Sequence, residues 1–291
     1  MGAAWGLSFS LARIAATRGV HPLGIAFWEC SIAGLLLICL MVFRRIPMPL
    51  TTGLARLHVT TGLVGMVIPA TAFFYAAAHV PAGVLSITVG IVPILTFVAS
   101  AFIGLEKFAI GRVIGVVLGT LAIVLLVAPE GSLPDRAQLP WVLLGFASAA
   151  CYTCLSLVLA LKAPPGANSI MLTCGMFVAA TLLMVPFLYA TSSFAPFGWP
   201  WGIVEWSLFG LGAINALAFT LYFILIDHAG PVFSSFTTNV VTLFGVFWGI
   251  VIFSEQNSIW VWLSFATMMI ALAMVAPRGR ASVEDAGAEP S

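Results

Sequence analysis

The chain has 291 residues, of which 62% are hydrophobic and only 7% are charged, and its formal net charge is +1. Water-soluble domains carry about 25% charged residues. No water-soluble fold buries so large an apolar fraction, so the composition indicates an integral membrane protein with lipid as its solvent. The net charge near zero gives no electrostatic basis for binding nucleic acid.

Apolar segments of about 17 to 25 residues, the length that crosses a bilayer as a helix, recur along the whole chain. We expect ten such transmembrane helices, at residues 3–20, 22–43, 57–79, 82–104, 109–128, 138–161, 167–190, 203–228, 231–254 and 258–277. Short breaks rich in Pro and Gly separate several of them, such as Pro81–Gly83 and Gly230–Pro231. The polar tail at residues 278–291 is predicted to be disordered and cytoplasmic.

A segment of the first half returns in the second half. A shift of 149 residues without a gap brings residues 71–122 onto residues 220–271, and ten positions are identical. Two of the identities involve rare residues, since His79 and Glu106 fall on His228 and Glu255. Internal duplication is typical of transporters. We therefore expect two five-helix repeats, residues 1–130 and residues 137–277.

An odd number of helices in each repeat predicts that the second repeat is inverted relative to the first. If the N-terminus is cytoplasmic, the inner loops and the tail hold most of the basic residues, as the positive-inside rule requires: Arg44, Arg45, Arg56, Lys107, Arg112, Lys162, Arg278 and Arg280. This arrangement predicts an inner (plasma) membrane protein with both termini in the cytoplasm. Glu106 and Glu255 should then lie on opposite sides of the membrane.

Motifs for catalysis and metal binding are missing from the sequence. It contains no His-Glu-x-x-His, no Gly-x-Ser-x-Gly and no Gly-x4-Gly-Lys-[Ser/Thr]. The cysteines lie in apolar runs, and Cys151-x-x-Cys154 has no second pair of ligands. We therefore predict no catalytic residues, no metal site and no cofactor. A membrane-embedded enzyme acting on lipid would need a cluster of His, Asp or Glu at one interface.

Polar and aromatic side chains inside the spans are the candidates for a substrate cavity, because lipid makes intramembrane polar groups costly. His79 ends the third span and Tyr75 lies one turn earlier on the same face, so both are predicted to line a central cavity. The alternative is that His79 caps the helix C-terminus, as its repeat partner His228 would. The other candidates for this cavity are Trp5, Phe9, Trp28, Glu29, Asn215, Tyr222, Asn239 and Trp248.

Arg13 and Glu29 lie at similar distances before and after the turn at His21. In an antiparallel helix hairpin they would reach the same depth, roughly 12 Å from the turn. Facing each other, they would offset much of the cost of burying either charge, so we predict an ion pair. The alternative is that Arg13 extends to the outer surface and that Glu29 faces the cavity, where it could meet a substrate amine.

Several short motifs share their order with a known transporter family. The first helix opens with Trp5-Gly6, and Ala77-Ala78-His79-Val80-Pro81-Ala82-Gly83 leads to Val92-Pro93-Ile94-Leu95 and then to Gly104-Leu105-Glu106-Lys107. This pattern resembles the EamA family of the drug/metabolite transporter superfamily, and the aromatic-rich helices are most similar to its YddG-type amino-acid exporters. The resemblance implies ten helices in an inverted 5+5 repeat around a central cavity. One departure is Glu29, which stands where the family often has an Arg, so the resemblance does not imply an anionic substrate.

The sequence predicts an alternating-access carrier that exports small metabolites, with neutral and aromatic amino acids as the first choice. The alternatives are a carrier for another small molecule, nucleoside-like or cationic, a channel or flippase-like conduit, and the lipid-modifying enzyme. Few ionisable groups lie in the candidate cavity helices, which favours weakly coupled or uncoupled transport. The expected partners are a small-molecule substrate and the bilayer. Gly111-x3-Gly115-x3-Gly119 predicts close helix contact, either within the chain or in a dimer.

Overall fold

A computed structural model describes residues 1–49, 51–105, 110–127, 133 and 135–275, and every regular element in these ranges is helical. Glu106, Lys107 and the predicted tail lie outside the described residues. The elements are α1 (Gly2–Thr17), α2 (Pro22–Arg44), α3 (Thr52–Gly62), η1 (Leu63–Val67), α4 (Ile68–Ala77), α5 (Ala82–Val89), α6 (Val92–Phe102), α7 (Ile110–Val127), η2 (Arg136–Gln138), α8 (Leu139–Lys162), α9 (Ser169–Thr191), α10 (Ile203–Ser235), α11 (Thr237–Phe253) and α12 (Ile259–Val275).

Side-chain caps and prolines set many of the helix starts. The Asn168 Oδ1 accepts hydrogen bonds from the backbone N–H groups of Ile170 and Met171, at 2.9 and 3.3 Å, and so begins α9. Pro22 is the first residue of α2, a position where the missing N–H of proline costs nothing. These local signals lie at the predicted breaks, which is why the predicted ranges and the helices agree to within a few residues at most boundaries.

Several long segments are interrupted rather than continuous. A π-helical turn, η1, joins α3 to α4, and α5 gives way to α6 at Gly90 and Ile91. α10 runs through the predicted break, but Gly230 within it has a φ of 80° and a ψ of 168°, which are not helical. Glycine tolerates this conformation without strain. The predicted division at Gly230–Pro231 is therefore present as a kink.

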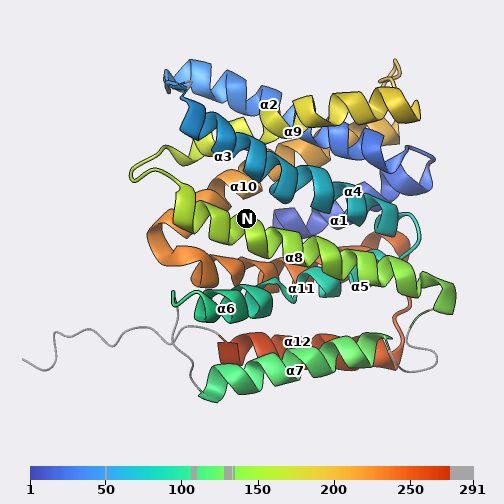
Figure 1. Cartoon of the computed structure of the whole chain (residues 1–291). Coiled ribbons are helices and arrows are strands. Elements are labelled where there is room, and N and C mark those ends of the chain that lie inside the picture. The colour runs from blue at the N-terminus through green and yellow to red at the C-terminus, as the bar shows by residue number, and fades with distance from the viewer. Residues whose placement is uncertain (50, 106–109, 128–132, 134, 276–291) are drawn as a thin grey trace, which may run out of the picture.

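The helices form one bundle whose members run across the view of Figure 1, with α2, α3 and α9 on one side and the α7–α12 pair on the other. α1 packs against α10 and α11, α2 against α9 and α10, α4 against α8, and α5 against α11. Helices from the two halves of the sequence are therefore interleaved. The core of the bundle lies where α1, α4, α8, α10 and α11 meet.

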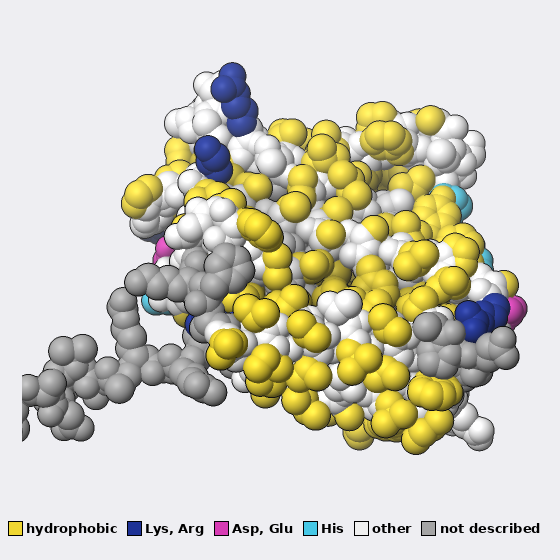
Figure 2. All heavy atoms as spheres, turned by 60° about the horizontal axis from the view of Figure 1, so that its bottom comes forward, with side chains coloured by type: hydrophobic (Ala, Val, Ile, Leu, Met, Phe, Trp, Pro, Cys, Tyr) yellow, Lys and Arg dark blue, Asp and Glu magenta, His cyan; other side chains and the backbone are white. Residues whose placement is uncertain are grey.

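The surface of the bundle is strongly apolar, as a lipid solvent requires. Figure 2 shows hydrophobic side chains covering the face over α7 and α12, with Lys and Arg near the two ends of the bundle. Among the described residues, seven helical segments are long and apolar enough to cross a membrane, and α11 and α12 are apolar but shorter. The chain is therefore a multi-pass membrane protein, as its composition predicts.

Two glycines of the stripe predicted for the fifth span, Gly115 and Gly119 in α7, pack against α12 and α6, whereas a Cβ atom on Gly111 would meet nothing within 4 Å. A Cβ atom on Gly115 would lie 2.8 Å from the Ala271 carbonyl oxygen, and one on Gly119 would collide with Ile94. The Ser264 hydroxyl of α12 also donates a 2.7 Å hydrogen bond to the Ala122 carbonyl of α7. Gly115 and Gly119 thus serve close helix contacts within the chain.

We expect Gly115→Leu to lower the free energy of unfolding by about 1–3 kcal/mol, because the larger side chain forces α7 away from α12. Thermal unfolding of the purified protein in detergent measures the change. Gly111→Leu is the matched control, since a Cβ there would meet nothing within 4 Å. Equal effects of the two substitutions would contradict this packing.

Candidate functional site

An internal cavity lies at the centre of the bundle and takes its walls from both halves of the chain. Side chains from α1, α2, α4, α8, α10 and α11 line it, together with Val89 and Val92 at the interruption between α5 and α6. The cavity volume is about 60 Å³, several times the roughly 10–15 Å³ that one water needs. The cavity is therefore large enough for a small chemical group.

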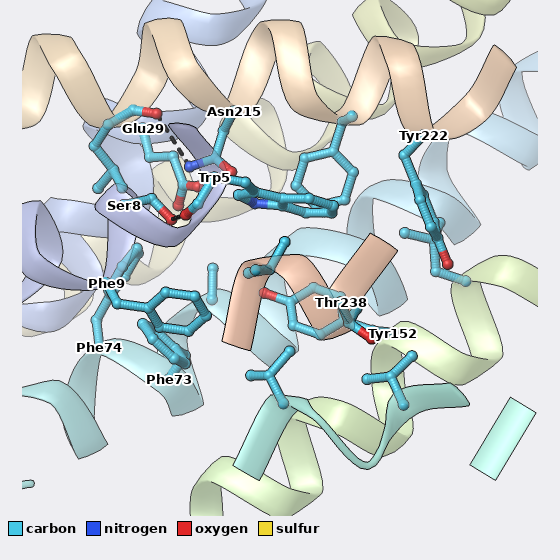
Figure 3. A pocket seen from close by; sticks show the side chains of 17 residues that line it. Trp5, Ser8, Phe9, Glu29, Phe73, Phe74, Tyr152, Asn215, Tyr222 and Thr238 are labelled. Carbon is cyan, nitrogen blue, oxygen red and sulfur yellow. Dashed lines mark hydrogen bonds between the residues drawn. The ribbon is translucent and has the colours of Figure 1, made fainter. Parts of the chain in front are cut away.

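Seven of the 17 described residues that line the cavity are aromatic (Figure 3). The Trp5 ring lies edge-on to Phe219 and Tyr222, with centroid distances of 5.1 and 5.8 Å. Phe9 meets Phe73 in the same way at 5.2 Å. Such edge-to-face contacts fix the rings in place, so the wall is a preformed aromatic surface.

One end of the cavity is polar, where Glu29, Ser8 and Asn215 lie together (Figure 3). Glu29 is only 4% exposed, and its Oε2 atom is buried without a hydrogen-bond partner in the described part of the chain. Ser8 donates its hydroxyl to the Trp5 carbonyl at 2.6 Å, and Asn215 donates an amide N–H to the Leu211 carbonyl at 3.0 Å. Ser8 and Asn215 thus donate to the backbones of their own helices and not to the Glu29 carboxylate.

Close packing of α2 against α10 produces this polar end. A Cβ atom on Gly212 would lie 2.7 Å from the Ile32 Cβ and 3.1 Å from the Glu29 carbonyl oxygen. Glycine at this position lets the α10 backbone approach α2 directly beside Glu29. Asn215, almost one turn further along α10, therefore lies at the same level of the cavity.

Half of the predicted cavity residues line this cavity: Trp5, Phe9, Glu29, Asn215 and Tyr222. The Tyr222 hydroxyl also shares a 2.8 Å hydrogen bond with the Ser156 hydroxyl, which fixes its ring against α8. Among these residues Glu29 follows the alternative stated above, since it faces the cavity.

His79 and Tyr75 were predicted to line the cavity, and the structure places them elsewhere. The His79 ring is exposed, stacks on Trp141 at a centroid distance of 3.9 Å, and contacts the Tyr75 carbonyl through Nδ1 at 2.9 Å. The Tyr75 hydroxyl lies 3.3 Å from the His21 Nε2 atom. His79 therefore caps the end of its helix, and His228 makes the equivalent contact with the Ile224 carbonyl at 2.8 Å.

Three other predicted residues also lie outside the cavity lining. Trp28 donates its indole N–H to the Ala195 carbonyl at 2.6 Å, and Trp248 donates its own to the Ala3 carbonyl at 3.2 Å. Both indoles hold chain segments together. Asn239 is half-buried near the start of α11, and its Oδ1 has no partner among the described residues.

The predicted ion pair between Arg13 and Glu29 is wrong. Arg13 pairs instead with Glu255, and its guanidinium carbon lies 4.6 Å from the centroid of the Phe253 ring. The Glu255 carboxylate also accepts hydrogen bonds from the backbone N–H groups of Ala82 and Gly83, at 2.8 and 3.1 Å. A residue after α11 thus caps the start of α5, where the helix dipole favours a negative charge. We call Arg13, Glu255, Ala82 and Gly83 the end clamp.

The comparisons with known proteins agree with this architecture. Residues 1–128 match the EamA-like transporter family. Over nearly the whole length, the chain is similar to a solved structure titled "Crystal structure of protein", with 21% identity, coverage of 94% of this chain and 93% of that chain, and a TM-score of 0.65. At this identity the likeness shows a shared fold alone. No curated protein matches the chain.

The EamA match covers the first half of the cavity wall, including Trp5, Phe9 and Glu29. The remaining wall, including Tyr152 and Asn215, comes from α8, α10 and α11 beyond the matched segment. The match supports the sequence resemblance over residues 1–128. It says nothing of the amino-acid exporter subtype.

Ser8, Phe74 and Thr238 also line the cavity but were not predicted as site residues. Small hydroxyl residues such as Ser8 and Thr238 serve helix packing throughout a membrane bundle, so their type alone did not distinguish them. A usable signal existed for Ser8, because α1 places it one turn after Trp5 and next to Phe9. Trp5, Ser8 and Phe9 of α1 all line the cavity, in keeping with the turn of a helix.

Proposed function

We propose that the chain as a whole is an EamA-type carrier that moves small metabolites across the membrane by alternating access. The observation that carries this proposal is the central cavity with its aromatic side chains, which both halves of the chain build. It contains the buried Glu29 carboxylate, whose Oε2 has no partner among the described residues. Cavities with apolar walls and a few fixed polar groups are the usual form of small-molecule sites. Neutral and aromatic amino acids, moved outward, are the first substrates to test.

The packing of the helices supports an inverted 5+5 repeat with ten membrane crossings. In this assignment α1 corresponds to α8, α2 to α9, α3 and α4 to the first part of α10, α5 and α6 to α11, and α7 to α12. When the two halves are exchanged, the α1–α10 contact becomes the α8–α4 contact. In the same way, the α2–α10 contact becomes the α9–α3 contact. All four contacts are present. The α2–α9, α5–α11 and α7–α12 contacts map onto themselves. Such exchange symmetry is what two interconvertible access states require.

Hollows of similar volume lie toward both ends of the bundle, about 500 Å³ along α8 and α10 and about 520 Å³ beside the end clamp, so the ion pair of the clamp is what distinguishes the two ends. The hollow of about 500 Å³ begins one turn beyond the cavity along α8 and α10, where Leu159 and Ile226 follow Leu155 and Tyr222. The end clamp ties α1, α5 and the end of α11 together near the opposite end. We propose that substrate exchanges through the hollow along α8 and α10 in this state and that release of the end clamp accompanies the other state.

We propose that both termini are cytoplasmic, in an inner membrane, so that the hollow along α8 and α10 opens inward. Ile46→Cys and Gln256→Cys, each in a chain without native cysteines, test this orientation. An impermeant thiol reagent added to intact cells should label the residue-256 variant and leave the residue-46 variant unlabelled until the membrane is opened. Equal labelling of both variants from outside would contradict the inverted arrangement.

Transport itself is tested with purified protein in liposomes. We expect saturable counterflow of at least one solute from a panel of labelled neutral and aromatic amino acids, aromatic amines and nucleosides, with little change when a pH gradient is imposed. Flux that rises linearly with solute concentration and shows no counterflow would indicate a channel. Absence of any solute flux would contradict the carrier proposal.

A further inference from the structure

The Glu29 carboxylate is the feature of the cavity that its own surroundings do not explain. It is almost fully buried, and its Oε2 atom has no hydrogen-bond partner among the described residues. A buried carboxylate is costly unless a hydrogen-bond donor or a cation meets it. Because Ser8 and Asn215 donate to backbone carbonyls nearby, Oε2 is left open to a donor on a molecule that enters the cavity.

No positively charged protein group is available for this role in the described lining. The described residues around the cavity include no Lys, Arg or His. Arg13, which lies four residues after the lining residue Phe9 on α1, is engaged by Glu255 in the end clamp. A cationic group on the cargo is therefore the counter-ion that fits Glu29.

The aromatic wall favours the same kind of cargo. Trp5 and Phe9 adjoin the polar end, and Tyr222 lies further from it (Figure 3). Phe219 and Phe73 extend this wall through their contacts with Trp5 and Phe9. Ring faces attract ammonium groups electrostatically, and the rest of the wall suits an apolar or aromatic body. The shape of the site therefore matches a molecule with one charged end and one ring.

We propose that Glu29 determines specificity by binding the ammonium group of a small aromatic amine, and that the cavity prefers such monocations to the matching amino acids. This inference rests on the proposed carrier function and narrows its substrate class. A zwitterion would bring a carboxylate into a cavity whose described lining offers no cation to receive it. Uncompensated burial of that second charge lowers affinity.

Isothermal titration of the purified protein with four matched probes tests the proposal: phenethylamine, phenylalanine, 3-phenylpropanoate and 2-phenylethanol. We expect phenethylamine to bind most tightly and 3-phenylpropanoate most weakly. Glu29→Gln keeps the shape and removes the charge, so it should weaken phenethylamine binding by roughly 10- to 100-fold. Binding of 2-phenylethanol should change by less than about threefold, which also shows that the variant cavity is intact.

Asp135→Asn, which alters an exposed carboxylate outside the cavity, is the matched control and should leave all four affinities unchanged. Equal binding of phenethylamine by the parent protein and by Glu29→Gln would overturn the assignment of Glu29. Phenylalanine binding as tightly as phenethylamine would overturn the preference for monocations. If none of the four probes binds while another solute shows counterflow, this inference fails and the carrier proposal stands.

Discussion

Glu255→Gln is expected to lower the free energy of unfolding by about 2–4 kcal/mol, a large effect for one atom exchange. The amide of Gln is uncharged and cannot neutralise Arg13. The carboxylate accepts hydrogen bonds from the backbone N–H groups of Ala82 and Gly83, and the amide NH2 group, itself a donor, cannot accept one of these bonds. Glu255 is 6% exposed, so water does not replace the lost interactions. Thermal and denaturant unfolding in detergent measure the change.

Charge exchange distinguishes the end clamp from a simple ion pair. Arg13→Glu with Glu255→Arg restores opposite charges, but an Arg cannot accept the hydrogen bonds from the start of α5. We therefore expect the double variant to stay less stable than the parent chain. Arg18→Gln, a change at an exposed position near the end of α1, should have little effect. Full recovery in the double variant would show that capping of α5 contributes nothing.

Ser8→Phe is expected to reduce transport in liposomes by at least about tenfold, because the added ring fills the polar end of the cavity. Ser8 lies on α1 between Trp5 and Phe9 and contributes directly to the lining. Ser8→Ala removes only the hydroxyl and should retain transport within about threefold. Thermal unfolding of both variants separates occlusion of the cavity from loss of fold. Transport by a folded Ser8→Phe protein at the parent rate would place the substrate path elsewhere.

Helix positions could be predicted from the sequence because their causes are local. Pro22, Asn168 and the Gly230–Pro231 break act on their own few residues, and the apolar runs between them need only lipid to become helices. Trp5 and Asn215 could be selected as cavity candidates for a related reason. An amide is costly inside a membrane span, and a large ring is a distinctive residue there. These choices require no knowledge of which helices are neighbours.

The failures share a cause, because each depended on which helices are neighbours. The hairpin argument placed Arg13 and Glu29 at similar depths in the membrane. Equal depth does not determine which neighbouring helix Arg13 of α1 faces. In the structure Arg13 meets Glu255, which is 242 residues away in sequence. His79 was placed by its nearness to a helix end, and the structure stacks it on Trp141 of α8 instead. Close helix contacts at positions such as Gly212 decide such pairings, and they are not visible in one sequence.

The accessibility of Thr238 tests the central claim, that cargo occupies the aromatic cavity and reaches it from either side of the membrane in turn. Thr238 is 5% exposed and lines the cavity from α11. The measurement is the rate at which a small impermeant thiol reagent labels Thr238→Cys, in a chain whose native cysteines are replaced, from each side of a liposome and with or without a transported solute. The carrier account predicts labelling from both sides, slowed on both by the solute. Labelling that the solute leaves unchanged, or that occurs from one side under every condition, would contradict it.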